Sequence, residues 1–319
     1  MSSPFFILAP MDDVTDVVFR HIISNTAAPD YFMTEFVNVD GLQSAGRTAT
    51  LNKLRIGSNE KSTIAQLWGK NPDNYKKSAA EIVDMGFAGI DINMGCPDKT
   101  IVNNGCCSAF IQPQNRNLAC EVIAAVKEGV AGRVPVSVKT RLGFNEVDYT
   151  WHELLLQQNI NMLTIHGRTR KEMSKVPADW QKIEHVRVLR NSLAPQTLIV
   201  GNGDVKDHKH GEELAKRHGL DGVMIGRGVF SDPYCFAETS PWQSMSARQK
   251  VLLFATHVEL FMQEWQKGER KFDTLKKFAK VYVNGFDGAS DARVQIMACK
   301  SAPELLDELS SLANRFPHQ

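Results

Sequence analysis

Eight short apolar runs, rich in Val, Ile and Phe, recur between residues 5 and 225. Helical or loop segments separate each run from the next. A run of about four to eight such residues, bounded by turn residues, is typical of a buried strand, and parallel strands need connections of this kind. We predict strands at residues 5–9, 31–36, 63–67, 88–92, 134–139, 162–166, 197–201 and 222–225.

The segments between these strands include amphipathic helices. Residues 72–85 carry Tyr75, Ala79 and Ile82 on one side, and residues 118–126 have similar spacing. Eight β/α units in succession favour an α/β fold of the (β/α)8 TIM barrel type. An open doubly wound sheet is the weaker alternative, because no Gly-x-Gly-x-x-Gly segment follows the first strand.

The alternation of strands and helices ends near Pro241. Ser246 to Gln249 resembles a capping box, and apolar residues at helical spacing follow it. A second amphipathic run covers residues 272–282, and a third begins at another predicted capping box, Ser301 to Glu304. We therefore predict a barrel at residues 1–243 and a small helical domain at residues 244–319.

The net charge of the chain gives no overall basic field. The chain has 319 residues, of which 43% are hydrophobic and 23% charged, and its formal net charge is +1. A nucleic-acid partner would therefore need a local patch. One stretch of the predicted helical domain is basic. It could be a solvated helix face or a surface that binds the phosphate backbone. Its basic residues are Lys267, Arg270, Lys271, Lys276, Lys277 and Lys280.

The spacing of the cysteines and the hydropathy of the chain indicate in which compartment the protein is found. The six cysteines show no paired spacing of the zinc or redox type, and the first residues carry no basic region or long apolar run. No apolar stretch reaches the roughly 18 residues of a membrane helix. We expect a reduced cytoplasmic protein with no membrane segment, and a monomer.

Polar residues follow nearly every predicted strand. In a barrel, the carboxyl ends of the strands meet on one face, so these residues are predicted to form a site. They are Pro10 and Met11, Glu35, Gln66, Asn93 with Cys96, Lys139 with Arg141, His166 with Arg168, Asn202 to Asp204, and Gly226 to Gly228.

The last two strands end in glycine-containing loops. Asn202-Gly203-Asp204 and Gly226-Arg227-Gly228 would let backbone N–H groups approach a phosphate, and Arg227 adds a charged fork. Tight β/α turns are the alternative. Lys139 should point into the barrel mouth, where it could form a Schiff base or act as a fixed cation beside a cofactor that gains negative charge.

Cys96 allows three interpretations. As a metal ligand it lacks partners at suitable spacing, so we predict no metal site. As a nucleophile it would need a lowered pKa. As a general acid it needs no shift of its pKa, because an unperturbed thiol stays roughly 97% protonated at pH 7.

Several motifs occur together in a recognisable order. They are residues 9–11, 15–16, 34–36, 66–67, 91–97, 99, 136–143, 166–169, 179–180, 201–204 and 224–228. With these segments the chain is similar to the tRNA-dihydrouridine synthases, FMN-dependent enzymes that reduce selected uridines of tRNA. Asp13 departs from the family pattern, which has Gly there, and so does the loop 103–108.

The resemblance implies a TIM barrel that binds FMN and a helical domain that binds tRNA. It implies FMN contacts by Pro10, Met11, Asp12, Gln66, Lys139, His166, Asn202, Gly203, Asp204, Gly226 and Arg227. It implies substrate or tRNA contacts by Glu35, Asn93, Arg141, Lys276, Lys277 and Lys280.

The same resemblance implies a reaction. NADPH reduces the flavin, flavin N5 gives hydride to C6 of uracil, and Cys96 protonates C5. The uracil must leave its stack, at a cost of a few kcal/mol. Two alternatives stay open: a flavin enzyme acting on a free pyrimidine, and a tRNA-binding protein without catalysis.

Overall fold

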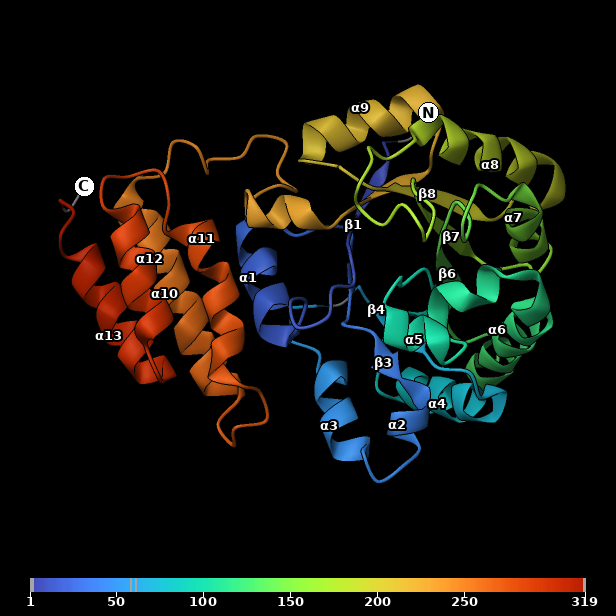
Figure 1. Cartoon of the computed structure of the whole chain (residues 1–319), viewed down its shortest axis with the longest axis horizontal. Coiled ribbons are helices and arrows are strands. Elements are labelled where there is room, and N and C mark those ends of the chain that lie inside the picture. Colours follow the sequence, from blue (N-terminus) through green and yellow to red (C-terminus); the bar gives the residue numbers. More distant parts are fainter. Residues whose placement is uncertain (1–2, 58, 61, 318–319) are drawn as a thin grey trace.

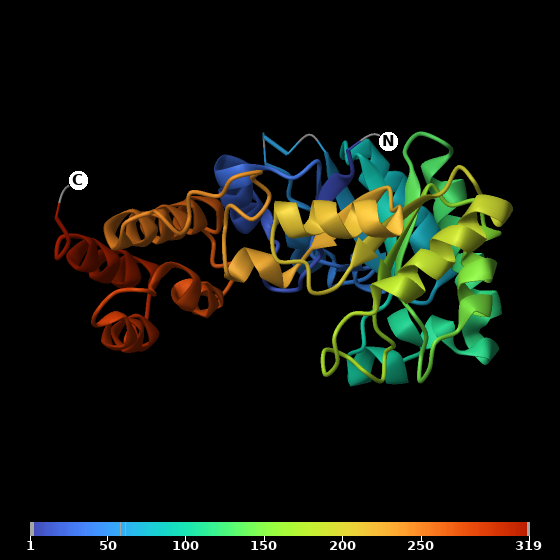
Figure 2. The same cartoon turned by 90° about the horizontal axis from the view of Figure 1, so that it is seen from above.

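The computed structural model describes residues 3–57, 59–60 and 62–317. The molecule is elongated, with a β/α barrel at one end and a group of helices at the other (Figures 1 and 2). The chain enters the helical group only after it has completed the barrel. Within the described residues, no helix combines the length and the apolar character needed to cross a membrane.

Eight parallel strands form a closed barrel, which confirms the predicted TIM barrel. Closure comes from β1, which pairs with both β9 and β2, and from β2, which pairs with β4. The strands are β1 (Phe5–Leu8), β2 (Tyr31–Met33), β4 (Thr63–Trp68), β5 (Gly89–Met94), β6 (Val136–Arg141), β7 (Met162–His166), β8 (Leu198–Asn202) and β9 (Gly222–Ile225).

One predicted strand is divided into two separate strands. The predicted strand at residues 31–36 ends at Met33, and a separate strand β3 (Val37–Asn38) pairs with the end of β4, Val37 opposite Leu67. Between the two strands, the buried Thr34 side chain accepts a hydrogen bond from the Gln66 backbone N–H. The backbone therefore leaves one ladder and joins another, a break that the apolar pattern does not indicate.

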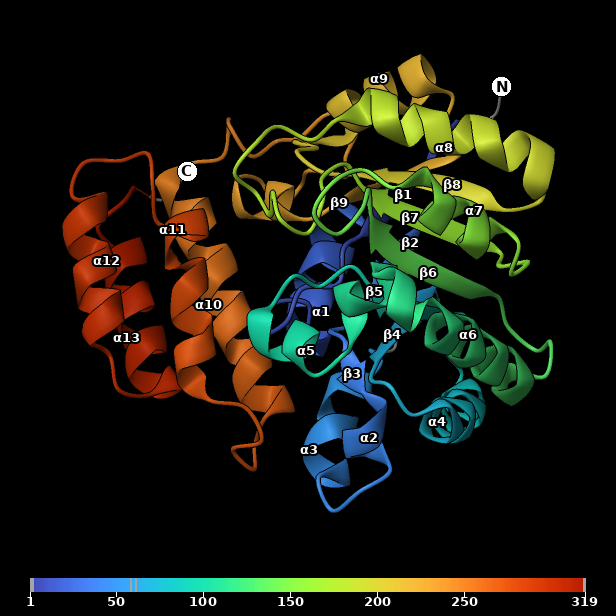
Figure 3. The ribbon, with the colours of Figure 1, turned by 45° about the vertical axis from the view of Figure 1, so that its right-hand side comes forward.

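Several helices begin where a capping side chain satisfies their free N–H groups. Asn71 caps α4 ahead of Pro72, and Asp16 caps α1 by accepting from Phe19. Figure 3 shows α4 and α6 side by side outside the barrel. The barrel helices are α1 (Val17–Ala27), α2 (Val39–Leu42), α3 (Arg47–Leu51), α4 (Pro72–Asp84), α5 (Lys99–Asn103), α6 (Arg116–Val130), α7 (Tyr149–Leu156), α8 (Trp180–Leu193) and α9 (His208–His218).

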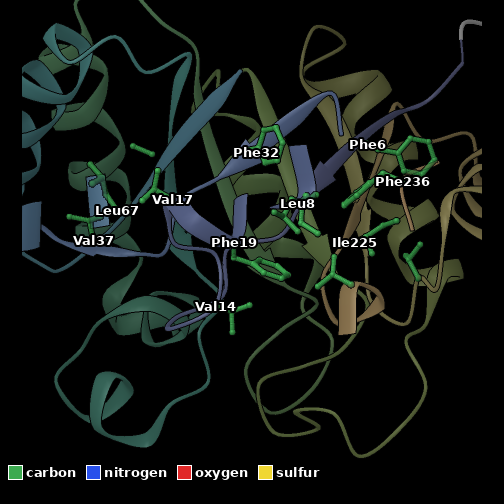
Figure 4. Close-up of a cluster of buried hydrophobic side chains, with 14 of the residues drawn as sticks. Phe6, Leu8, Val14, Val17, Phe19, Phe32, Val37, Leu67, Ile225 and Phe236 are labelled. Atoms are coloured by element: carbon green, nitrogen blue, oxygen red, sulfur yellow. The ribbon is translucent and has the colours of Figure 1, made fainter. Parts of the chain in front are cut away.

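Strand β1 separates two apolar cores by its alternation. Phe6 and Leu8 face outward into a large cluster with Phe19 (Figure 4). Ile7 and Ala9 join a smaller cluster. This period of two is what a strand with two buried faces requires. Burial of each large side chain contributes about 1.5–3 kcal/mol, so β1 is held from both sides.

The C-terminal helices continue the outer core. Phe19 of α1 stacks on Phe278 with ring centroids 4.9 Å apart, and α1 packs against α10. The elements are α10 (Ala247–Glu264), η5 (Phe272–Phe278), α11 (Ala279–Tyr282), α12 (Ala289–Ala298) and α13 (Ala302–Ala313), η5 being a 3-10 helix. The barrel and the helices therefore share buried apolar surface.

The predicted caps of this region had different outcomes. Ser246 and Gln249 form a full capping box, as predicted. Ser301 caps α13 by accepting a hydrogen bond from the Glu304 backbone N–H. The Glu304 side chain accepts from Lys300 N at 2.7 Å and not from Ser301 N, so the prediction of a full capping box there was wrong. The run 272–282 is a 3-10 helix followed by one short α-helical segment.

Candidate active site

A cavity of about 250 Å³ opens at the carboxyl end of the barrel. The ends of β1, β6, β7, β8 and β9 supply its walls, as parallel topology dictates. Nine of the eleven predicted cofactor residues line it, together with Arg141 from the predicted substrate set. The lining comprises Ala9, Pro10, Met11, Lys139, Arg141, His166, Asn202, Gly203, Asp204, Val205, Met224, Gly226 and Arg227.

Lys139 is held at the base of this cavity by Asn202. Its ammonium donates to Asn202 Oδ1 at 3.2 Å, and Asn202 Nδ2 donates to the Met224 carbonyl at 2.9 Å, which fixes the orientation of the amide. Burial lowers the pKa of Lys139 to about 8, with Arg141 adding to the shift and Asp91 opposing it. Lys139 is therefore mostly protonated at pH 7.

His166 is a neutral imidazole with a defined tautomer. Arg168 Nη1 lies 3.2 Å from His166 Nε2, and because arginine can only donate, Nε2 must accept. The ring proton then resides on Nδ1. Burial, with Arg141 and Lys139 adding their positive charge, lowers the pKa of His166 well below its usual value. His166 can donate a hydrogen bond from Nδ1 but is a poor source of a proton.

Asp204 connects the two guanidinium groups of this side of the cavity. It accepts from Arg168 and, at 3.0 Å, from Arg227. It also accepts from the Ala178 N–H at 2.9 Å. Burial raises the pKa of Asp204, but the hydrogen bond from Arg168 and that from Ala178 outweigh burial and leave the pKa lowered. The carboxylate is therefore ionised and positions both arginines.

The glycines keep this wall free of side chains. Gly203 has φ +123°, and a Cβ there would lie 2.7 Å from Ala178 Cβ and 3.0 Å from His166. A side chain at Gly226 would meet only Ala9 and Met11 at 3.5 Å or more, so it would occupy the cavity itself. The requirement for glycine at Gly226 thus comes from the space that a ligand would need.

A buried chain of hydrogen bonds runs beneath the mouth from β6 to the turn after β5. The Asp91 carboxylate accepts from Ser137 Oγ at 2.6 Å and from Gln66 Nε2 at 2.7 Å. Gln66 Oε1 in turn accepts from Asn93 Nδ2 at 3.0 Å. Asn93 Oδ1 accepts from the Cys96 N–H at 2.9 Å. The carboxylate of Asp91 therefore sets the direction of every amide up to Cys96.

Cys96 lies beside the cavity and not in its wall. Arg141, which does line the cavity, donates to the Gly95 carbonyl at 2.7 Å and so joins the two regions. Burial raises the pKa of Cys96, which keeps the thiol protonated near neutral pH. Within residues 3–57, 59–60 and 62–317, no three His, Cys, Asp or Glu side chains gather as metal ligands.

Several predicted contacts lie away from the cavity. Gln66 and Asn93 belong to the buried chain below it, and Asp12 is exposed and paired with Lys53. Glu35, predicted as a substrate contact, has no exposed side-chain surface and pairs with Arg270 at 2.9 Å. That pairing removes Glu35 from the surface on which a substrate could reach it.

The basic stretch is less basic at its surface than its sequence suggests. Arg270 is 12% exposed and bonded to carboxylates, and Lys276 pairs with Asp273 at 2.8 Å with its side chain 14% exposed. Lys277 donates to the Asp13 carbonyl at 2.8 Å. Lys280 is exposed and makes no ion pair with any residue that the structure describes. Lys277 and Lys280 are thus the members of the predicted tRNA set with exposed side chains.

Sequence reasoning missed the supporting residues of the site. The sequence pattern places Asp91 in a strand without indicating its partners, and it places Arg168 beside His166 without indicating its bond to Asp204. The signal for Asp91 was present, because a carboxylate inside a buried strand needs partners on the neighbouring strands. The role of Arg168 depends on its distance to His166 and Asp204, which the sequence does not contain.

Known proteins resemble this chain over almost its full length. The family model described as Dihydrouridine synthase (Dus) matches residues 7–316. A probable tRNA-dihydrouridine synthase of Staphylococcus aureus (strain COL) is 44% identical over 315 residues, covering 97% of this chain and 94% of the relative. The probable tRNA-dihydrouridine synthase 2 of Bacillus subtilis (strain 168) is 43% identical, covering 98% and 95%.

Solved structures share the fold at low identity. Histamine dehydrogenase from Rhizobium sp. 4-9 aligns with a TM-score of 0.55 and 12% identity, over 80% of this chain and 48% of that one. A 2-naphthoyl-CoA reductase complex aligns with a TM-score of 0.56 and 10% identity, over 72% and 48%. These alignments agree with the barrel architecture, and the full-length relatives show that the chain belongs to the dihydrouridine synthase family.

Proposed function

We propose that this protein reduces specific uridines of tRNA to 5,6-dihydrouridine, with FMN as cofactor and NADPH as reductant. Family membership supports the reaction. The observation that carries the cofactor assignment is the charge around the cavity. Three cationic side chains line it, and a fourth, Arg168, pairs with Asp204, the acidic residue among the lining residues. The three lining cations are Lys139, Arg141 and Arg227.

The residues present fit a phosphate-bearing flavin. Gly203 and Gly226 leave room for backbone approach, and Arg227 offers a guanidinium that is 64% exposed at its side chain. We assign the phosphate to these loops, with Asn202 and Asp204 shaping them. Pro10 and Met11 would border the ring, and Lys139 would face its pyrimidine edge as a fixed cation. A Schiff base is unnecessary in this reaction.

The chemistry that bound FMN would supply, after reduction by NADPH, is hydride transfer to C6 of the uracil. The chain's own residues have simpler tasks. Lys139 holds a positive charge next to the ring, and His166 offers its Nδ1–H as a hydrogen-bond donor. Cys96 donates the proton to C5, and its raised pKa keeps that proton available. The buried chain from Asp91 to Asn93 fixes the turn that carries the thiol.

The tRNA is proposed to contact both parts of the molecule. A stacked uracil cannot reach the cavity, so the base must be turned out, which costs a few kcal/mol. Phosphate contacts from residues 244–319, with Lys277 and Lys280 foremost, would offset that cost. Arg141 would contact the uridine from the cavity side. A cytoplasmic location and a monomeric state stay predictions.

The direct test uses purified protein, FMN, NADPH and unmodified tRNA. We expect dihydrouridine at defined positions, mapped by mass spectrometry, and none when FMN or NADPH is omitted. Free uridine serves as the competing substrate, since equal reduction of it would favour a free-pyrimidine enzyme. A protein that binds no FMN and forms no dihydrouridine would refute the proposal. The same mapping in cells lacking the protein, with and without its restoration, identifies the position.

A further inference from the structure

A cluster of acidic residues lies where the C-terminal helices meet the first loop of the barrel. Asp13 and Asp16 follow β1, and Glu35 follows β2. Glu35 has no exposed side-chain surface, and the Asp16 side chain is 8% exposed. Two carboxylates in such positions cannot both be ionised without a cation close by. The guanidinium of the nearby barrel cation, Arg20, donates instead to Glu60 and to the carbonyls of Thr15 and Arg55.

Arg270 supplies that cation from the far end of the chain. Its Nη1 and Nη2 donate to the two oxygens of Glu35 at 2.9 and 3.1 Å, and its Nε lies 3.1 Å from Asp16 Oδ2. Asp13 Oδ1 is 3.6 Å away. All three nitrogens of the planar group therefore face carboxylates, an arrangement that only arginine can make.

The same cluster holds the loop that carries Met11. Glu35 Oε1 accepts from the Asp13 N–H at 2.6 Å, and Asp13 has φ +57°, a conformation that costs energy without glycine. The loop then folds back on itself, because Thr15 Oγ1 accepts from Met11 N at 3.0 Å. Lys277 adds a bond to the Asp13 carbonyl. Met11 lines the cavity.

We propose that Arg270 is a positioning residue that makes cofactor binding in the barrel depend on the C-terminal helices. It neutralises Glu35 and Asp16, Glu35 then fixes Asp13 in its left-handed conformation, and this fixes Met11 against the flavin. The inference rests on the proposed function, because it assigns Met11 to the flavin. It also explains why Glu35 is an acid although it cannot reach substrate.

Arg55 provides a matched control. It also joins the barrel to the helical segment, pairing with Glu264 at 2.7 Å and Glu269 at 2.8 Å, and it stacks over Trp265. Its side chain makes none of the described bonds to the loop at residues 10–16. Loss of either arginine therefore removes an ion pair between the two parts, but only Arg270 holds the cavity loop.

The experiment measures FMN affinity of the purified full-length protein by quenching of flavin fluorescence, for Arg270→Gln and Arg55→Gln. Hydrogen exchange of residues 10–16 without cofactor is the second measurement. We expect Arg270→Gln to raise the Kd for FMN at least tenfold and to speed exchange in this loop, with Arg55→Gln close to the parent in both. The double variant Arg270→Gln with Glu35→Gln should regain much of the affinity, because it removes an unpaired buried charge.

The possible results either support the positioning role of Arg270 or overturn it. Should Arg270→Gln fail to fold, Arg270→Lys keeps the charge but loses the planar contacts, and we expect it to raise the Kd for FMN above that of the parent and to speed exchange of residues 10–16. Parent-like Kd and exchange for either folded variant would overturn the inference. Equal weakening by the Arg55 and Arg270 variants would overturn it as well. A parent protein that binds no FMN would instead refute the proposed function.

Discussion

Asp91→Asn tests whether a buried carboxyl group controls how the stability of the protein depends on pH. Asp91 is fully buried, and burial raises its pKa to about 6 against the opposing bonds from Ser137 and Gln66. The introduced amide is nearly isosteric with the carboxyl group. Its oxygen can accept from Gln66, and its NH2 can donate to the Ser137 hydroxyl, so the chain of bonds to Cys96 survives. The substitution therefore removes the charge and little else.

The magnitude follows from linkage between proton binding and folding. A pKa raised from 3.8 to about 6 favours the protonated carboxyl in the folded state. This contribution to stability is complete below pH 3.8 and is lost as the pH rises through 6. Each pKa unit corresponds to about 1.4 kcal/mol, so the parent loses roughly 3 kcal/mol across this window. The Asn variant has no such loss.

The assay is urea unfolding of parent and variant at intervals between pH 4 and pH 8. We expect the free energy of unfolding of Asp91→Asn, relative to the parent, to rise by about 3 kcal/mol over this range and to level off above pH 7. Ser137→Ala is the control: it deletes a bond that lowers the Asp91 pKa, so its transition should move to higher pH. A difference between parent and Asp91→Asn that does not change with pH would refute the reasoning.

Three further predictions concern the site and its surface. Cys96→Ala should bind FMN and oxidise NADPH like the parent but lose about 10²- to 10⁴-fold in uridine reduction, and unchanged dihydrouridine formation would remove Cys96 from the mechanism. The FMN affinity of the parent should fall above pH 8, because the anionic cofactor favours the protonated Lys139, whereas Lys139→Met should show no such fall in a fluorescence titration. Lys280→Gln should weaken tRNA binding and flatten its dependence on salt, while Lys276→Gln, already paired with Asp273, should leave the salt slope nearly unchanged.

Local patterns determined the barrel and much of its cavity. Short apolar runs bounded by turn residues alternate with helical segments, and this alternation favours buried parallel strands. The carboxyl ends of parallel strands must share one face, so Lys139, His166, Asn202 and Arg227 could be assigned to a common site from the sequence. The capping box at Ser246 is equally local, because its partners lie within one helical turn.

The tertiary structure alone decided which polar groups pair with each other. Arg270 and Glu35 are 235 positions apart, and they meet only because apolar packing of α1 on α10 brings the helices onto the barrel. In the sequence Arg270 is one more cation in a basic stretch, and Glu35 is one more polar strand end. The sequence shows which residues can carry a charge, but the fold decides which charged residues pair with each other. The sequence therefore specified the barrel and most of the cavity lining, while long-range packing decided which charges are buried and which face the solvent.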